Sequence, residues 1–67
     1  MASLGKKLGR RITELRRKRG LTIEKLAYEN DFSKGYLSSI ESGRKLPSLT
    51  FLNRIARALG VEIRDLF

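Results

Sequence analysis

The chain has 67 residues, enough for one domain near the lower size limit for folding without disulfides, metals or a partner chain. It contains neither Cys nor His, which excludes thiol nucleophiles, imidazole bases and the usual zinc ligands. We therefore expect no catalytic site, cofactor, metal or small-molecule ligand. The net charge of +8 indicates a polyanionic partner. No apolar run approaches the roughly 20 residues of a membrane span, so we predict a cytoplasmic protein.

The first predicted helix covers residues 6–19 and ends before Gly20. Leu8, Ile12 and Leu15 recur at spacings of four and three residues, which places them on one helix face. The same segment holds eight of the 15 Lys and Arg residues but only one of the 7 acidic residues. This concentration of positive charge in one segment favours contact with phosphates or an anionic membrane, and an ordinary solvated face is the alternative.

Four further short helices are predicted, and each has helical rather than alternating apolar periodicity. Thr22, Ser33 and Ser48 are candidate N-caps of the second, third and fourth helices, and Gly43 and Gly60 end the third and fourth. The segments are 23–30, 33–42, 49–59 and 61–67. No segment can bury its apolar face alone, so we expect one compact, all-α, five-helix domain over residues 1–67.

The second and third segments, joined by a tight turn, have the dimensions of a DNA-binding helix-turn-helix over about residues 22–43. Ala27 supplies the small side chain that two closely crossing helices need. Asp31 occupies the turn position that favours a positive φ. The apolar wedge that fixes the crossing angle comes from Leu26, Phe32, Leu37 and Ile40.

Several blocks along the chain carry a family resemblance. They are Gly20-Leu21-Thr22, Leu26-Ala27, Phe32-Ser33, Leu37-Ser38, Ile40-Glu41-x-Gly43, Pro47-Ser48-Leu49, Ile55-Ala56-x-Ala58-Leu59-Gly60-Val61 and Asp65-Leu66-Phe67. With them the chain resembles the Cro/CI-type, lambda-repressor-like family of helix-turn-helix regulators over essentially its whole length. The resemblance implies a five-helix domain whose third helix enters the DNA major groove. Asn30 and Asp31 depart from the family's usual apolar residue and Gly in the turn, and Ile23 replaces a Gln that contacts DNA in many relatives.

The resemblance implies two sets of DNA contacts. Residues at base-proximal positions are Lys34, Gly35, Tyr36, Ser38 and Ser39. Residues assigned to phosphates are Thr22, Lys25, Ser42, Arg44 and Lys45. Lys34 can donate to guanine O6 and N7, whereas the Ser hydroxyls discriminate weakly. For Tyr36 we favour a phosphate contact through the hydroxyl, with a half-buried position at the core edge as the alternative.

Two structural expectations accompany these contacts. The resemblance implies an ion pair between Arg16 in the first helix and Glu41 in the third, which would orient the third helix. One short recognition helix buries too little surface to discriminate a genome, so we expect a homodimer on a pseudo-palindromic site with half-sites about 34 Å apart. Candidate dimer residues are Ile63, Leu66 and Phe67. The alternative is that Leu66 and Phe67 complete the core of the monomer.

Taken together, these patterns predict a sequence-specific, double-stranded DNA-binding transcriptional regulator of the nucleoid, a repressor or autoregulator. Its size fits a phage-type repressor, a restriction-modification controller or an antitoxin. The alternative is a basic protein-protein interaction module, or an antitoxin whose DNA binding is secondary. A membrane-surface role for the first helix is disfavoured, because its apolar face is needed for the core.

Overall fold

The computed structural model describes residues 3–67, which form four α-helices followed by a short 3-10 helix. The elements are α1 (Leu4–Lys18), α2 (Ile23–Asn30), α3 (Lys34–Glu41), α4 (Leu49–Ala58) and the 3-10 helix η1 (Ile63–Leu66). The all-α class is as predicted, but the expected fifth α-helix is a single 3-10 turn. A reciprocal capping box closes this turn, in which the Glu62 amide donates to Asp65 Oδ2 at 2.9 Å.

A hydroxyl cap opens each α-helix and fixes where it begins. The side chains of Thr22, Ser33 and Ser48 accept hydrogen bonds from the amides three residues later, as their positions in the sequence predict. Ser3 makes the same bond to the amide of Lys6 at 3.2 Å. This additional cap explains why α1 begins two residues earlier than the apolar periodicity indicates.

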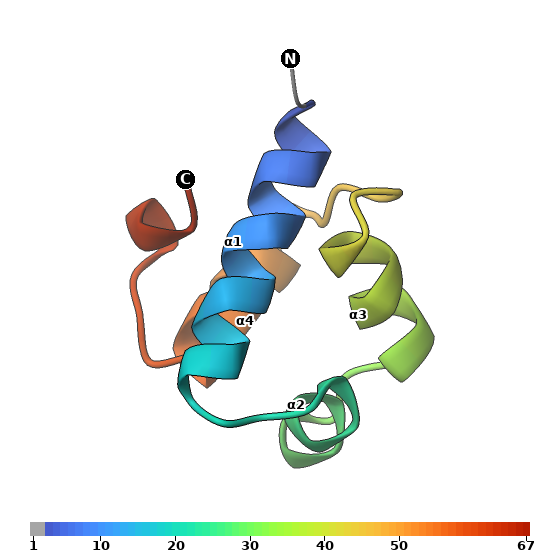
Figure 1. Ribbon diagram of the computed structural model, residues 1–67, viewed down its shortest axis with the longest axis vertical. Helices are drawn as coiled ribbons and strands as arrows, with labels where there is room; N and C mark the ends of the chain where they lie inside the picture. Colours follow the sequence, from blue (N-terminus) through green and yellow to red (C-terminus); the bar gives the residue numbers. More distant parts are fainter. Residues whose placement is uncertain (1–2) are drawn as a thin grey trace.

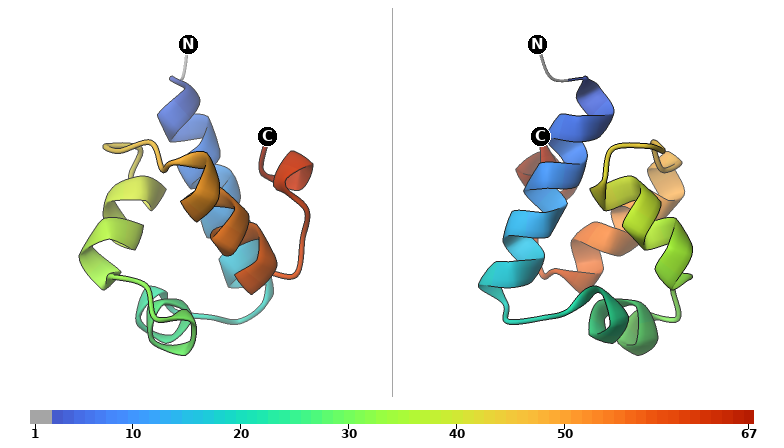
Figure 2. Two further views of the ribbon diagram at one scale, coloured as in Figure 1. Left: turned by 180° about the vertical axis from the view of Figure 1, so that it is seen from behind. Right: turned by 45° about the vertical axis from the view of Figure 1, so that its right-hand side comes forward.

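The helices are arranged around α1, which runs down the middle of the view in Figure 1 with α4 behind it. The views of Figure 2 place α2 across the lower end of the molecule and the C-terminal segment beside α1. Helix α1 packs on α3 and η1, while α2 packs on α3. One side of α3 therefore rests on the rest of the domain. Among residues 3–67, no helix combines the length and the apolar character needed to cross a bilayer.

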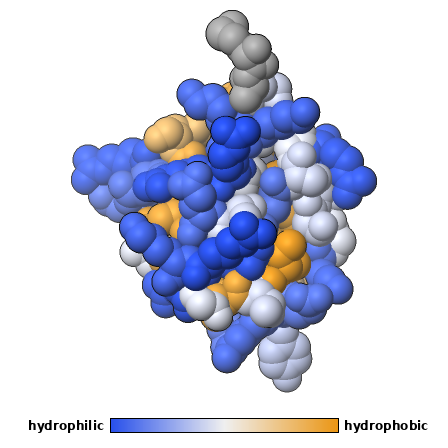
Figure 3. All heavy atoms as spheres, viewed as in Figure 1, coloured by the Kyte–Doolittle hydropathy of each residue, from blue (hydrophilic) through white to orange (hydrophobic). Residues whose placement is uncertain are grey.

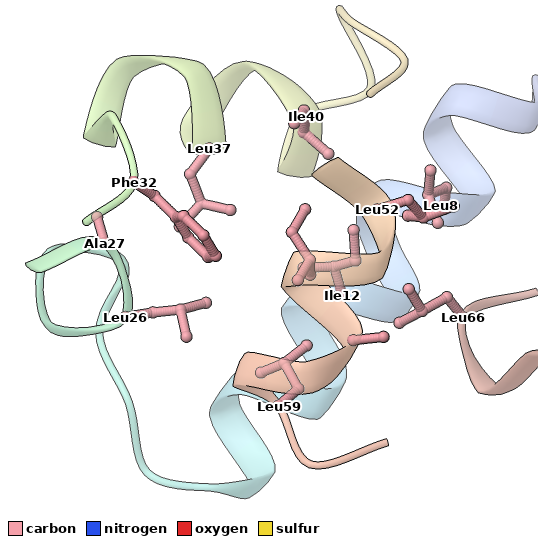
Figure 4. Packing of buried hydrophobic residues seen from close by; sticks show 12 residues of the cluster. Leu8, Ile12, Leu26, Ala27, Phe32, Leu37, Ile40, Leu52, Leu59 and Leu66 are labelled. Carbon is pink, nitrogen blue, oxygen red and sulfur yellow. The ribbon is translucent and has the colours of Figure 1, made fainter. Parts of the chain in front are cut away.

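Every element contributes to the hydrophobic core, which Figure 4 shows between α1, α3 and α4. Its buried members are Leu8, Ile12, Leu26, Ala27, Phe32, Leu37, Ile40, Leu52, Ile55, Ala56, Leu59 and Leu66. Leu37 and Ile40 anchor α3 in this core, and both are 0% exposed. Because these two residues point inward, the opposite face of α3 is available for other contacts.

The turn between α2 and α3 forms without glycine. Asp31 has φ 58° and ψ 37°, the left-handed conformation predicted from its position, and it is the only described non-glycine residue with a positive φ. The amide of Phe32 donates to the carbonyl of Ala27 at 2.8 Å. Asn30 Nδ2 also reaches back to the carbonyl of Leu26 at 2.9 Å. Of the two departures from the family pattern, Asn30 thus adds a side-chain hydrogen bond within the last turn of α2, and Asp31 adopts the left-handed conformation that ends the helix.

Helix α1 approaches the end of α3 closely at Gly9. A Cβ atom at this position would overlap the carbonyl oxygens of Ile40 and Glu41. The lack of a side chain therefore sets the distance between the two helices. This contact and the turn after α2 fix the orientation of α3 from both ends.

Candidate nucleic-acid interface

The outer face of α3 carries small and polar groups. Lys34 and Gly35 are exposed, and Ser38 and Ser39 are partly exposed. A Cβ added at Gly35 would meet nothing within 4 Å, so the backbone is accessible there. The Ser39 hydroxyl donates to the carbonyl of Gly35 at 3.0 Å and keeps its oxygen free to accept. Four of the five residues predicted to lie near bases therefore share one accessible helix face.

The fifth, Tyr36, lies at the edge of the core, the alternative position considered for it. Its ring is half-buried and packs on Phe51 of α4 in a tilted arrangement, with centroids 4.9 Å apart and an interplanar angle of 57°. Phe51 in turn packs on Phe32 at 4.9 Å. Lys45 Nζ lies 5.8 Å from the centroid of the Tyr36 ring. Tyr36 thus joins α3 to α4 through an aromatic chain and holds a cation of the following loop over its ring.

The residues assigned to phosphates flank α3 on two sides. After α3, Arg44 Nε donates to Ser42 Oγ at 3.1 Å, and Ser42 Oγ donates to the carbonyl of Ser39. The amides of Arg44 and Lys45 also converge on the Ser39 carbonyl, at 3.0 and 3.2 Å. These bonds hold a compact, cationic loop against the C-terminal end of α3.

On the other side lies the start of α2. Thr22 is exposed and accepts from the amide of Lys25, which is itself exposed. Ile23 is partly buried and packs against the core instead of extending a polar side chain outward. The structure therefore shows an apolar anchor at the start of α2, in agreement with a missing polar contact from Ile23.

A buried ion pair joins α1 to the C-terminal end of α3. Arg16 Nε lies 2.9 Å from Glu41 Oε2 and Arg16 Nη2 lies 3.0 Å from Oε1, with side-chain exposures of only 9% and 6%. Thr13 Oγ1 donates to the same carboxylate at 2.7 Å. Arg16 Nη1 donates to the carbonyl of Leu21 at 2.6 Å. One guanidinium therefore links α1, α3 and the loop that leads into α2.

This arrangement satisfies both buried charges. No buried side-chain nitrogen or oxygen within residues 3–67 lacks a hydrogen-bond partner. A buried pair of this kind gains little net free energy over apolar packing, but loss of one partner leaves an uncompensated charge and costs about 3–5 kcal/mol. The pair therefore determines where α3 sits relative to α1.

Two further arginines of the basic segment have structural roles that the sequence did not reveal. Arg11 Nε donates to the carbonyl of Asp65 in η1 at 2.8 Å. Arg19 Nη1 donates to the carbonyl of Leu59 at the end of α4 at 3.0 Å. These bonds satisfy carbonyls that a helix end leaves free. The face of Figure 3 that carries α1 is nonetheless largely hydrophilic.

A second ion pair lies at the N-terminal end of α3. Lys34 Nζ lies 2.9 Å from Glu24 Oε2, and the two side chains are 61% and 64% exposed. The hydrogen bond donated by Lys34 lowers the pKa of Glu24 below its ordinary value. No role for Glu24 was predicted from the sequence. The available signal was its place in the first turn of α2, which the tight turn brings next to the first turn of α3.

The comparison with known protein families decides the family. A sequence model of the helix-turn-helix domain matches residues 7–66. The chain belongs to this helix-turn-helix family. It is 45% identical over 57 residues to the helix-turn-helix transcriptional regulator y4dJ of Sinorhizobium fredii, covering 85% of this chain and 74% of that protein. It spans less than half of two longer regulators that it matches, 40% of one and 46% of the other.

Two solved restriction-modification controller proteins have the same helix-turn-helix fold. C.AhdI of Aeromonas hydrophila superimposes with a TM-score of 0.89 at 36% identity, covering 94% of this chain and 96% of that one. C.Esp1396I, solved as a tetramer in complex with its natural 35 base-pair operator, superimposes with a TM-score of 0.82 at 26% identity, covering 98% and 97%. The resemblance to helix-turn-helix regulators predicted from the sequence is confirmed.

The three candidate dimer residues of this helix-turn-helix domain lie in different environments. Leu66 is only 1% exposed and completes the core of the monomer, as the alternative prediction had it, so it is not available as a dimer surface. Ile63 is partly buried against the core, whereas Phe67 is 64% exposed. Phe67 and Leu4 line a hollow of about 320 Å³ beside α1. Figure 3 shows apolar atoms beside α1 on the side where the C-terminus lies.

Proposed function

We propose that this helix-turn-helix domain is a sequence-specific, double-stranded DNA-binding transcription regulator that places the outer face of α3 in the major groove. The observation that carries the proposal is the contrast between the two sides of α3. Its inner side is fixed by the core and by the buried pair of Arg16 and Glu41, and its outer side carries exposed hydrogen-bonding groups. A rigid helix with a small, polar outer face suits direct reading of base edges.

Recognition would combine a modest base-reading surface with strong positioning on the DNA backbone. Lys34 would donate to guanine, and the backbone at Gly35 would approach the bases closely. The loop cations Arg44 and Lys45 would contact phosphates, aided by Thr22 at the start of α2. Because no Arg, Asn or Gln lies on α3, DNA shape would carry a large part of the specificity.

We propose that the domain acts as a homodimer on a pseudo-palindromic operator with half-sites about 34 Å apart. The exposed ring of Phe67 and the neighbouring Leu4 give the apolar surface for such pairing. Sedimentation at micromolar concentration tests it, with Phe67→Ser as the disrupting variant and Tyr28→Ser, a change at a more exposed aromatic on α2, as its control. A wild-type protein that stays monomeric would contradict pairing through this surface.

In the cell, the regulator would act at the nucleoid in the cytoplasm as a repressor or autoregulator, without enzymatic activity. The phosphate-binding loop and the net charge of +8 would attract any duplex, so repression depends on the preference for an operator over bulk DNA.

Selection of binding sites from randomised duplex DNA tests the function. We expect an inverted repeat whose affinity falls steeply as salt rises. Arg44→Gln should weaken binding to all sequences and reduce the salt dependence, whereas Arg57→Gln, which removes an exposed cation from α4, is the matched control. Recovery of no motif would contradict the regulator and favour a basic protein-binding module.

A further inference from the structure

Glu24 lies in the first turn of α2, where a carboxylate suits the helix dipole, but that position does not require its pairing with Lys34. Both side chains are more than half exposed, and exposed pairs of this kind contribute little to stability. A carboxylate at this place also acts against the proposed function, because it stands beside the groups that would meet a polyanion, Lys34 itself and the cap residue Thr22. A binding surface built for affinity alone would carry a neutral or cationic residue here.

The geometry points to Glu24 as a positioning residue that makes Lys34 selective for a base edge. This inference rests on the proposed function. An unrestrained lysine at the start of α3 reaches phosphates as readily as bases, because its ammonium is a point charge on a flexible stem. The carboxylate lies 2.9 Å from the ammonium and offsets part of its charge. The attraction of Lys34 for phosphates then falls, and phosphate contacts carry no sequence information.

Lys34 keeps its capacity to read a base in this arrangement. An ammonium has three N–H donors, of which Glu24 occupies one. The remaining two match the O6 and N7 acceptors of guanine in the major groove. The free carboxylate oxygen can accept from the N4 amino group of cytosine. The pair as a unit therefore complements the donor and acceptor pattern of a G·C base pair.

The test compares Glu24→Gln with Glu29→Gln in binding to the selected site and to random duplex DNA. Both changes raise the net charge by one, and Glu29 is exposed on the same helix with no ion pair within residues 3–67. Between 50 and 200 mM salt, the loss of affinity for random DNA should be roughly 3.5 times larger for Glu24→Gln than for the control. This ratio is the salt effect expected of one added phosphate contact. Preference at one G·C position of the selected motif should fall at least about fivefold.

A Lys34→Gln background shows whether Glu24 acts through Lys34. In the double variant, Glu24→Gln should add no more than the control does. Circular dichroism verifies that each variant is folded. An effect of Glu24→Gln equal to that of Glu29→Gln, or one that persists fully without Lys34, overturns the inference while the selected motif still supports the proposed function. Absence of any motif for the wild-type protein overturns both.

Discussion

The two ends of α3 each carry an ion pair with the same N···O separation, 2.9 Å, in opposite surroundings. At the C-terminal end, Arg16 and Glu41 are almost fully buried and share hydrogen bonds with Thr13 and with the loop before α2. At the N-terminal end, Glu24 and Lys34 stand in solvent and bind only each other among the described residues. A distance alone therefore does not distinguish a buried structural pair from a solvent-exposed one.

Burial is what separates the two pairs. Removing a partner from the buried pair leaves a charge that water cannot reach, so the position of α3 changes or the domain unfolds. Removing a partner from the exposed pair leaves a charge that water solvates, so the free energy of unfolding should change little. The C-terminal end of α3 is thus fixed for architecture, and the N-terminal end is free to serve recognition.

The largest effect is expected from Arg16→Met, which keeps an unbranched apolar stem but removes the charged guanidinium. Glu41 would remain buried without its cation, and the free energy of unfolding should fall by about 3–5 kcal/mol. Urea denaturation followed by circular dichroism measures this change. A loss below about 1 kcal/mol would mean that the buried pair does not hold α3, and the contrast between the two ends would disappear.

A smaller effect should follow from Gly9→Ala, which tests the same end of α3 through packing. The added methyl group would push against the carbonyls of Ile40 and Glu41, and overpacking of this kind costs about 1–3 kcal/mol. Gly35→Ala is the matched control at the opposite end, where a methyl group meets nothing within 4 Å. That change should leave stability unchanged or raise it by up to about 1 kcal/mol. Equal losses of unfolding free energy for Gly9→Ala and Gly35→Ala would contradict the difference between the two ends of α3.

The smallest effect concerns pH at the exposed pair. Because the pKa of Glu24 is lowered by the hydrogen bond from Lys34, its small contribution to stability is complete above the ordinary glutamate pKa and is lost as pH falls through the lowered value. NMR titration of the Glu24 carboxyl carbon should give a midpoint below the ordinary value. Lys34→Gln should raise that midpoint, and an unchanged midpoint would show that the two groups do not interact in solution.

Most of the fold could be predicted because local chemistry encodes it. Hydroxyl caps such as Ser33 mark helix starts, Gly43 marks an end, and Asp31 accepts the left-handed turn conformation. The environment of Leu66 could not be predicted, because an apolar residue near the C-terminus fits a dimer surface and a core equally well. Only the path of the chain after α4, which folds η1 back onto α1, decides between them.

The candidate site was predictable in outline but not in its partners. Helical periodicity places Ser38 and Ser39 on the outer face without reference to any other element. The roles of Arg11 and Arg19 depend on acceptor carbonyls that are distant in sequence. The sequence of the basic helix therefore does not distinguish these two arginines from the solvent-exposed ones. Glu24 was missed for the same reason, since its partner lies across the turn on another helix.

The most direct test of the contrast between the two ends is to neutralise their two carboxylates and compare Glu41→Gln with Glu24→Gln in the same urea denaturation experiment. Both substitutions keep the shape of the side chain and remove one negative charge. We expect Glu41→Gln to lower the free energy of unfolding by about 3–5 kcal/mol, because the Arg16 guanidinium stays buried without a counter-charge. Glu24→Gln should unfold like the wild-type protein. Equal unfolding curves for the two variants would contradict the account.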